Sequence, residues 1–335
     1  ADNLFWVGRY AERAEFNSRL LRLTLRFLVT GENDYSGCLQ RLLVAVTEQT
    51  VTPPGFVGAG AEQRLQAPEQ ELLSVIADRK RAGSLSQTMQ NLLLAARSLR
   101  DRLSTDTWSV VNDIDDELDS LQHIAPERLA DALDELDNLV KALSAFSGLT
   151  LENMARGRGW TFLDMGRRLE RAIQTTRLIN SLLVPPGDDT AAAVLMESLL
   201  LVVESMMSYR RRYRSGVSVA SLLEMVVTDA LNPRSLAYQL ARMEEHVNDL
   251  PDERQPGYLS DLKRLALESA TLVRLADVGQ LAEVNPQTQR RDTLAAFLGG
   301  MSQRLPALSN NLAAAYFEVA ETPHQLVQFR VPSKS

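Results

Sequence analysis

Leucine and other apolar residues recur every three or four positions along almost the whole chain, a spacing that places them on one face of a helix. The first such run includes Leu20, Leu25 and Leu28 and leads towards Gly31, a residue type that commonly ends helices. No segment shows the alternation of apolar and polar residues, bounded by turn residues, that is typical of a strand. The sequence therefore predicts an all-α protein.

The pattern predicts about a dozen helices joined by short loops. The strongest loop signal, rich in Pro and Gly, is the stretch from Val51 to Gly60. Pro126 is well placed at the first turn of a helix, and Pro306 is expected to break the last one. Helices are expected over or around residues 1–31, 42–46, 84–103, 106 onwards, 126–143, 160–184, 189–213, 217–230, 233–249, 257–280 and 290–320.

The sequence resembles itself at a fixed offset. Gly8-Arg9 and Glu12-Arg13-Ala14 align with Gly166-Arg167 and Glu170-Arg171-Ala172, and the same register aligns Leu42-Leu43-Val44 with Leu200-Leu201-Val202 without a gap. Chance identity between leucine-rich helices is the alternative, but one register that links two separate helices favours a duplication. We expect two duplicated helical-bundle halves, 1–157 and 158–325, packed as one unit and followed by a tail, 326–335.

The repeated motif Gly-Arg-x-x-Glu-Arg-Ala carries the most promising chemistry. A glycine inside a helix costs about 1 kcal/mol relative to alanine, so its presence in both copies indicates close approach of another backbone. Each glutamate can reach the arginine three positions earlier, Arg9 for Glu12 and Arg167 for Glu170. Three interpretations are open: a structural ion-pair network that joins the halves, a polar pocket for an anionic or peptide-like ligand, or a solvated face.

Two other places are candidates for anion binding. The cluster Arg210-Arg211-Arg212-Tyr213-Arg214 is the densest in positive charge, and one or two of its arginines either face inward to bind carboxylates or make ion pairs at a helix end. Asn232-Pro233-Arg234-Ser235 predicts a helix N-terminus, with Asn232 as N-cap and Pro233 in the first turn. Free amides there would hold an anion beside Gln239, or the segment is a plain cap.

Composition narrows the function classes. The 335 residues hold 36 Lys and Arg against 43 Asp and Glu, and the net charge of −7 disfavours non-specific nucleic-acid binding. The single cysteine, Cys38, excludes an intramolecular disulfide and suits a cytoplasmic protein. No apolar run approaches the roughly 18 residues of a membrane helix, and no signal peptide is recognisable. Because the chain opens at Ala1, already in helical sequence, we expect native residues upstream.

Motifs for metal and nucleotide chemistry are not found. The histidines His123, His246 and His324 lie far apart without a His-Glu-x-x-His pattern, so no metal site is expected. The chain also has no Gly-rich phosphate loop and no Gly-x-Ser-x-Gly nucleophile elbow. We therefore expect no cofactor in this chain.

An ordered set of motifs resembles the bacterial alpha-E domain family. They are Asn3-Leu4-Phe5-Trp6-Val7-Gly8-Arg9-Tyr10-Ala11-Glu12-Arg13-Ala14-Glu15, the stretch from Gly159 to Ala172, Arg97 to Trp108, Ser208 to Tyr213, Asn232 to Leu240, and Ala315-Tyr316-Phe317. The resemblance covers essentially the whole chain. It implies an all-helical protein of a mostly uncharacterised family, whose members are encoded beside, or fused to, circularly permuted ATP-grasp ligases.

The resemblance and the motifs together give three functional hypotheses. The first is a helical accessory subunit of an ATP-grasp-type peptide or amide ligase, with ATP and magnesium bound by the partner. The second is a self-contained enzyme with Glu12 or Glu170 as general acid or base. The third is a structural homo-oligomer. The residues expected to bind an acidic or peptide-like substrate are Arg9, Arg13, Arg167, Arg171, Arg211, Arg212, Asn232, Arg234, Ser235 and Gln239.

Overall fold

The computed structural model describes residues 1–30, 36–124, 128–185, 189–214, 216–251 and 258–317. Within these ranges the chain forms fifteen α-helices, one 3-10 turn and one π-helical turn, and no strand. The all-α prediction is therefore confirmed. The expected stop at Gly31, the expected start at Pro126 and the expected tail 326–335 lie outside the described residues.

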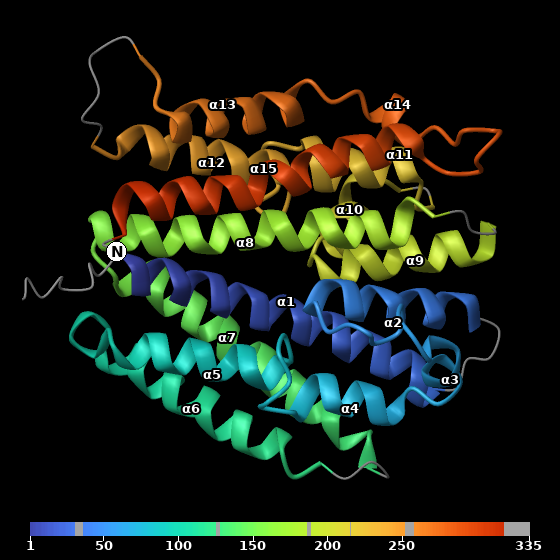
Figure 1. The fold of residues 1–335 in the computed structure, drawn as a ribbon, viewed down its shortest axis with the longest axis horizontal. Coiled ribbons are helices and arrows are strands. Elements are labelled where there is room, and N and C mark those ends of the chain that lie inside the picture. Colours follow the sequence, from blue (N-terminus) through green and yellow to red (C-terminus); the bar gives the residue numbers. More distant parts are fainter. Residues whose placement is uncertain (31–35, 125–127, 186–188, 215, 252–257, 318–335) are drawn as a thin grey trace, which may run out of the picture.

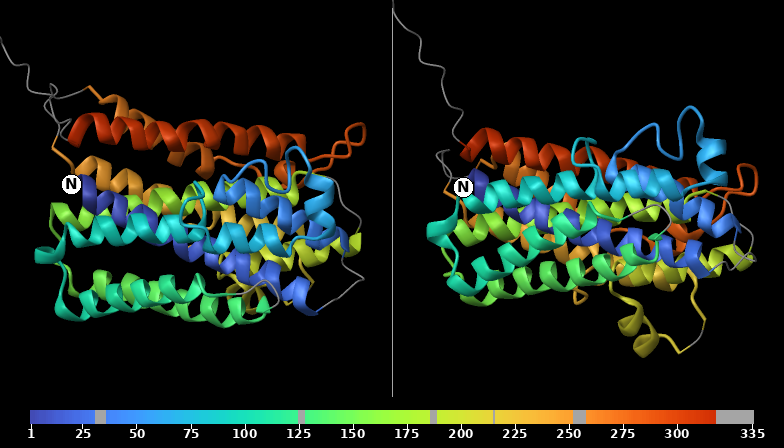
Figure 2. Two further views of the ribbon diagram at one scale, coloured as in Figure 1. Left: turned by 60° about the horizontal axis from the view of Figure 1, so that its bottom comes forward. Right: turned by 90° about the horizontal axis from the view of Figure 1, so that it is seen from below.

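Two long helices form the centre of the molecule. Helix α1 (Asp2–Thr30) and helix α8 (Arg158–Leu183) lie side by side and run in the same direction (Figure 1). The helix predicted at 160–184 matches the bounds of α8 closely. This prediction succeeded because the apolar periodicity and the Pro-rich segment after the helix are local signals. Most of the other long helices run roughly along the same axis as this pair (Figure 2).

The first half of the chain surrounds α1. Helices α5 (Leu85–Arg97) and α7 (Asp131–Asn153) pack against α1, and α6 (Thr105–Leu121) packs against both of them. Helix α2 (Ser36–Thr50) contacts α1 and α8 together. Ser84 and Ser104 accept hydrogen bonds from backbone N–H groups three residues later, which caps α5 and α6. The cap of α5 lies at the predicted start, and α6 begins at Thr105, one residue before the predicted position.

The second half surrounds α8 in the same manner. Helices α12 (Leu236–Asp249) and α15 (Asp292–Tyr316) pack against α8, and α13 (Asp261–Arg274) packs against both of them. Helix α9 (Asp189–Val202) contacts α8 and α1 together. The remaining short elements are α3 (Ala61–Gln66), α4 (Glu69–Ala77), η2 (Arg100–Arg102), α10 (Met206–Arg212), α11 (Val219–Leu223), η4 (Glu224–Thr228) and α14 (Val278–Ala282).

One hydrophobic core extends through both halves. Phe5 and Leu20 of α1, Phe146 of α7, Leu169 of α8 and Leu308 of α15 are all buried in the same contiguous cluster. Helices from the first and second parts of the described chain therefore share one contiguous core.

The expected single helix over 189–213 is wrong after Val202. Glu204 has a left-handed φ of 55°. The Ser205 N–H donates to the Leu200 carbonyl at 2.8 Å and the Glu204 N–H to the Leu201 carbonyl at 3.2 Å, the pattern of a Schellman helix end. That position is usually a glycine, so the sequence carries no visible stop signal. Helix α10 consequently turns by 115° from α9.

The expected break at Pro306 is also wrong, because α15 continues through this residue to Tyr316. A proline in a helix interior removes one backbone hydrogen bond and costs about 3 kcal/mol. Leu305 and Leu308 on either side are fully buried in the core, and their packing offsets that cost.

No single helix among the described residues is long and apolar enough to cross a membrane. The bent pair formed by 191–202 and 206–212 passes that test by length and composition only.

A pair of carboxyl groups between α6 and α7 predicts a pH-dependent stability. Burial, together with the hydrogen bond to Glu135 and its charge, raises the pKa of Glu117 from 4.5 to about 7. The protonated form is favoured in the folded state, so the stability that Glu117 contributes is complete below about pH 4.5 and is lost as the pH rises through 7. We expect Glu117→Gln, which keeps a hydrogen-bond donor, to remove this loss.

The measurement is urea unfolding at pH 5, 6, 7 and 8 for the parent chain and for Glu117→Gln. The matched control is Glu268→Gln, which changes an exposed glutamate on α13. Parallel curves of unfolding free energy against pH for the parent and Glu117→Gln would contradict the assignment. A Glu268→Gln curve that parallels the parent confirms that the effect is local.

Candidate functional site

The repeated glycines allow α1 and α8 to touch through their backbones. A Cβ atom on Gly8 would lie 2.1 Å from the Leu163 carbonyl oxygen, and one on Gly166 would lie 2.1 Å from the Phe5 carbonyl oxygen. Neither distance is compatible with any side chain at these positions. The close backbone approach expected from the sequence is confirmed, and it brings the motif residues of both helices within reach of each other.

Glu12 of α1 and Arg171 of α8 form a buried, two-bonded ion pair. Arg171 Nε donates to Glu12 Oε1 at 2.5 Å and Arg171 Nη2 donates to Oε2 at 2.6 Å. Glu12 is 2% exposed and Arg171 9%. Burial alone would raise the pKa of Glu12, but the charge and hydrogen bonds of Arg171 and the charge of Arg234 lower it below 4.5.

Glu170 of α8 is held by two arginines of α1. Arg9 Nε donates to Oε2 at 2.6 Å, Arg13 Nε donates to Oε1 at 2.6 Å, and Gln174 Nε2 donates to Oε1 at 2.9 Å. Arg9 also donates to Ser309 Oγ of α15 at 2.9 Å. Burial alone would raise the pKa of Glu170, but Arg13 and Arg9 lower it far below its ordinary range.

The two ion pairs are equivalent under the sequence repeat. Glu12 binds Arg171 and Glu170 binds Arg13. The glutamate of each Glu-Arg dipeptide therefore binds the arginine of the other dipeptide. The expected pairing within each helix is wrong, since Arg9 binds Glu170 of the other helix instead of Glu12. Arg167 lies near Glu12, and its Nε has no hydrogen-bond partner among the described residues.

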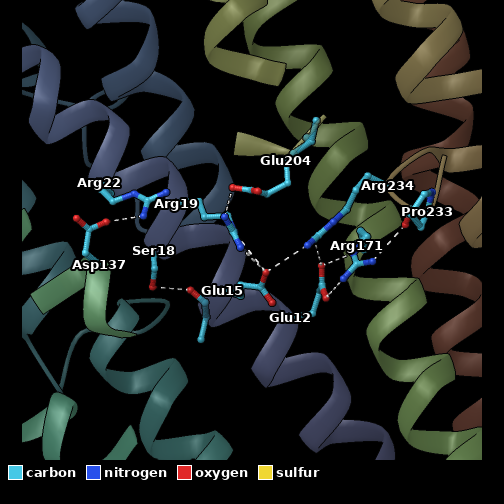
Figure 3. A network of polar contacts seen from close by, with 12 residues as sticks. Glu12, Glu15, Ser18, Arg19, Arg22, Asp137, Arg171, Glu204, Pro233 and Arg234 are labelled. Carbon is cyan, nitrogen blue, oxygen red and sulfur yellow. Dashed lines mark hydrogen bonds and ion pairs between the residues drawn. The ribbon is translucent and has the colours of Figure 1, made fainter. Parts of the chain in front are cut away.

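A second set of contacts extends the network along α1 (Figure 3). Arg19 Nη2 donates to Glu15 at 2.9 Å, and Arg19 also pairs with Glu204, the left-handed residue after α9. Arg234 lies 3.5 Å from Glu15 and 3.9 Å from Glu12. The network therefore ties α1 and α8 to the end of α9 and to the loop before α12.

The segment 232–239 is a structural loop and cap, and its residues differ in role from the prediction. Ser235 caps α12 by accepting from the Tyr238 N–H at 3.0 Å, so the expected N-cap at Asn232 and first turn at Pro233 are wrong. Asn232 Nδ2 donates to the Met225 carbonyl at 3.0 Å. Gln239 Nε2 donates to the Pro233 carbonyl at 2.7 Å. These bonds fix the loop that carries Arg234.

Arg211 and Arg212 lie outside this network. Both are on the short helix α10 and are exposed. Arg212 pairs with Glu224, the first residue of η4, and, at 2.8 Å, with Asp229, the residue that follows η4. Neither arginine bonds to Glu12 or Glu170, so the structure separates the basic cluster from the repeated motif.

A neighbouring polar group was missed by the sequence reasoning. Asp164 of α8 accepts from Arg168 at 2.8 Å and pairs with His246 Nε2 of α12 at 2.8 Å. Burial alone would raise the pKa of Asp164, but these two partners lower it to about 2. The i,i+4 spacing of Arg168 was visible in the sequence, whereas His246 is too distant along the chain to leave a signal.

The geometry gives the repeated motif a bracing role. Both glutamates are buried, which contradicts the solvated-face interpretation, and both carboxylates are held ionised by arginine. A general acid or base needs a pKa near the working pH, which these groups lack. Glu12 and Glu170 line neither the cavity of about 290 Å³ near Phe162 and Tyr316 nor the cavity of about 580 Å³ between α2 and α8.

Comparison with known proteins places these features in a wider group. Residues 1–317 match the Alpha-E family, described as a predicted alpha-helical domain with a conserved ER motif. Uncharacterised proteins of Mycobacterium bovis and of two strains of Mycobacterium tuberculosis are 34% identical to the chain over 326 residues. The alignments cover 93% of this chain and 36% of each relative, so the chain spans about a third of their length. No solved structure matches the chain.

Proposed function

The chain belongs to the Alpha-E family, and we propose that it is the helical, non-catalytic partner of an ATP-grasp-type peptide or amide ligase. In this role it docks the ligase and holds an acidic or peptide-like substrate, while the ligase binds ATP and magnesium. The ligase system is what the family resemblance implies. The structure supports the non-catalytic part of the proposal.

One observation carries that part. The arginine of each Glu-Arg dipeptide donates hydrogen bonds to the glutamate of the other dipeptide across the α1–α8 interface. Both carboxylates are therefore buried and ionised. The motif therefore holds the fold together and offers no group that transfers a proton near neutral pH. We propose that a partner supplies the chemistry. The greater length of the mycobacterial relatives is compatible with a domain that works next to another one.

We also propose that the halves 1–157 and 158–325 descend from a duplication. Helices α1, α5, α6 and α7 contact one another in the same pattern as α8, α12, α13 and α15. The reciprocal glycine contacts and the exchanged ion pairs have the same two-fold relation.

The test uses the ATP-grasp protein encoded in the same genome, produced with and without this chain. The proposal predicts that the two proteins co-purify, and that release of phosphate from ATP with amino-acid substrates increases when the chain is present. The chain alone is expected to release none. An unrelated helical protein at the same concentration is the control. Absence of co-purification together with an unchanged rate would contradict the proposal.

A further inference from the structure

Arg19 and Arg177 hold corresponding positions in α1 and α8, six residues after the arginine of each Glu-Arg dipeptide. Arg19 has two anionic partners, Glu15 of its own helix at 2.9 Å and Glu204 at the end of α9 (Figure 3). Arg177 has no such pair among the described residues, although it lies near Glu170. The two sides of the central helix pair therefore differ in charge, while their Glu-Arg pairs correspond.

One partner of Arg19 is replaced within the helix itself. The repeat aligns Glu15 with Ile173, an apolar residue that is buried. Glu15 reaches Arg19 because residues four positions apart are neighbours on a helix surface. Ile173 stands four positions before Arg177 and offers no carboxylate there.

The other partner, Glu204, corresponds to Val51. Each is the left-handed residue that follows the second helix of its half, with φ of 55° and 56°. The N–H of the next residue donates to the carbonyl five residues earlier, at 3.2 Å after α2 and at 2.8 Å after α9. The caps of α5 and α12 correspond as well, because Ser84 Oγ and Ser235 Oγ each donate to the carbonyl six residues earlier. The helix ends thus correspond here, and not in the ungapped register of the leucine-rich stretches.

The guanidinium of Arg177 is half-buried and makes no hydrogen bond among the described residues. None of its nitrogens is a fully buried atom without a partner, so they are open to water. Burial lowers the pKa of Arg177, Glu170 opposes this shift, and the charges of Arg13 and Arg9 add to it. Withdrawing a cation from water without an anionic partner is costly, which favours an anion from solution at this place.

Glu170 does not fill that need, because its oxygens already serve other donors. Arg9 and Arg13 bind it at 2.6 Å each, and Gln174 donates to it at 2.9 Å. The Arg13 side chain is 29% exposed, and its Nη1 has no hydrogen-bond partner among the described residues. A further anion would therefore meet an excess of positive charge from Arg177 and Arg13 without displacing an existing bond.

We propose that Arg177 binds the carboxylate of an acidic or peptide-like ligand, in the place that Glu204 takes beside Arg19. A carboxylate fits a guanidinium through two parallel hydrogen bonds. Val51 is 55% exposed, and β-branched residues rarely adopt its left-handed conformation. The fold therefore does not require valine there, and valine leaves Arg177 open to an external anion. The site rests on the proposed function only for the identity of the natural ligand.

The first experiment is titration calorimetry of the full chain with N-acetyl-glutamate and with its neutral diamide, N-acetyl-glutamine amide. The acid is expected to bind, and both the diamide and the variant Arg177→Gln to lose about ten-fold or more in affinity, the loss typical of one charged hydrogen bond. Arg264→Gln, which changes an exposed arginine on α13, is the matched control and should bind like the parent. Since no ligase is present, a negative result is separate from one in the co-purification test.

A second pair of variants tests the correspondence between Val51 and Glu204. Val51→Glu and Val51→Gln both remove the branched side chain from the left-handed position, but only glutamate brings a carboxylate. We expect Val51→Glu to unfold at a higher temperature than Val51→Gln and to lose the binding of N-acetyl-glutamate. Val51→Gln should bind like the parent. Circular dichroism checks that every variant is folded.

Three results would overturn the proposal. The first is no heat of binding with N-acetyl-glutamate at millimolar concentration. The second is equal unfolding temperature and equal binding for Val51→Glu and Val51→Gln, which would show that a carboxylate at this position does not reach Arg177. The third is inorganic phosphate that binds as tightly as N-acetyl-glutamate, which would identify a general anion site.

Discussion

Replacing Arg171 by alanine is expected to lower the free energy of unfolding by about 3–5 kcal/mol, the usual effect of removing one partner from a buried ion pair. Glu12 is 2% exposed and would lose both of its short hydrogen bonds. The nearest remaining cation, Arg234, lies 3.9 Å away and also serves Glu15. Urea unfolding followed by circular dichroism measures the effect.

An exposed ion pair is the control. Arg242 pairs with Glu245 at 2.6 Å on the surface of α12, and Arg242→Ala should change the free energy of unfolding by less than about 1 kcal/mol. The double variant Glu12→Gln, Arg171→Met should recover part of the loss caused by Arg171→Ala, because no uncompensated charge remains buried. Equal effects of Arg171→Ala and Arg242→Ala would rule out the bracing role.

Gly8→Ala is the second substitution with a large expected effect. The new methyl carbon would meet the Leu163 carbonyl oxygen at 2.1 Å, and backbone atoms cannot move aside as a side chain does. We expect a loss of about 3 kcal/mol or more, at or above the upper end of ordinary overpacking. Gly166→Ala should behave alike, because its methyl carbon would meet the Phe5 carbonyl oxygen at the same distance.

Gly148→Ala tests the same chemical change without the clash. Gly148 lies in α7, and a Cβ atom there meets nothing within 4 Å. Alanine is the better helix former by about 1 kcal/mol, so this variant should be more stable than the parent. The same substitution is thus expected to have opposite signs at the two positions. A stabilising Gly8→Ala would refute the backbone contact between α1 and α8.

The parts of the fold that the sequence predicted depend on local chemistry. The apolar spacing of α8, the start of α5 after Ser84 and the motif glycines each act within a few residues of the chain. Gly8 and Gly166 carried the most information, because a glycine at matching points of two long helices has a cost that only close packing offsets. The same repeated motif identified Glu12 and Glu170 as candidate site residues.

The parts that were missed depend on distant partners. Arg9 has a possible partner at Glu12, three residues away in its own helix, yet it binds Glu170. The backbone contact places the other helix's carboxylate closer to the guanidinium, and no local pattern reveals that choice. Asp164 and His246 meet for the same reason, since their helices pack side by side although the residues are far apart in the chain.

Other errors arose where two local signals compete. Asn232 and Ser235 are both good N-cap residues, but only Ser235 caps α12, because the Asn232 Oδ1 accepts from the Arg234 N–H at 3.1 Å within the loop. Glu204 ends α9 in a left-handed conformation that a glycine would normally supply. Its pairing with Arg19 holds it there, so the helix end depends on a contact with α1.

The most direct test is a double-mutant cycle on Glu12 and Arg171. The free energy of unfolding is measured for the parent, Glu12→Gln, Arg171→Gln and the double variant. If the Glu-Arg motif braces the two halves, the two single losses should exceed the double loss by about 1–3 kcal/mol, as coupled buried residues do. Losses that add to within about 0.5 kcal/mol would show that Glu12 and Arg171 act independently, and the motif would then need another role.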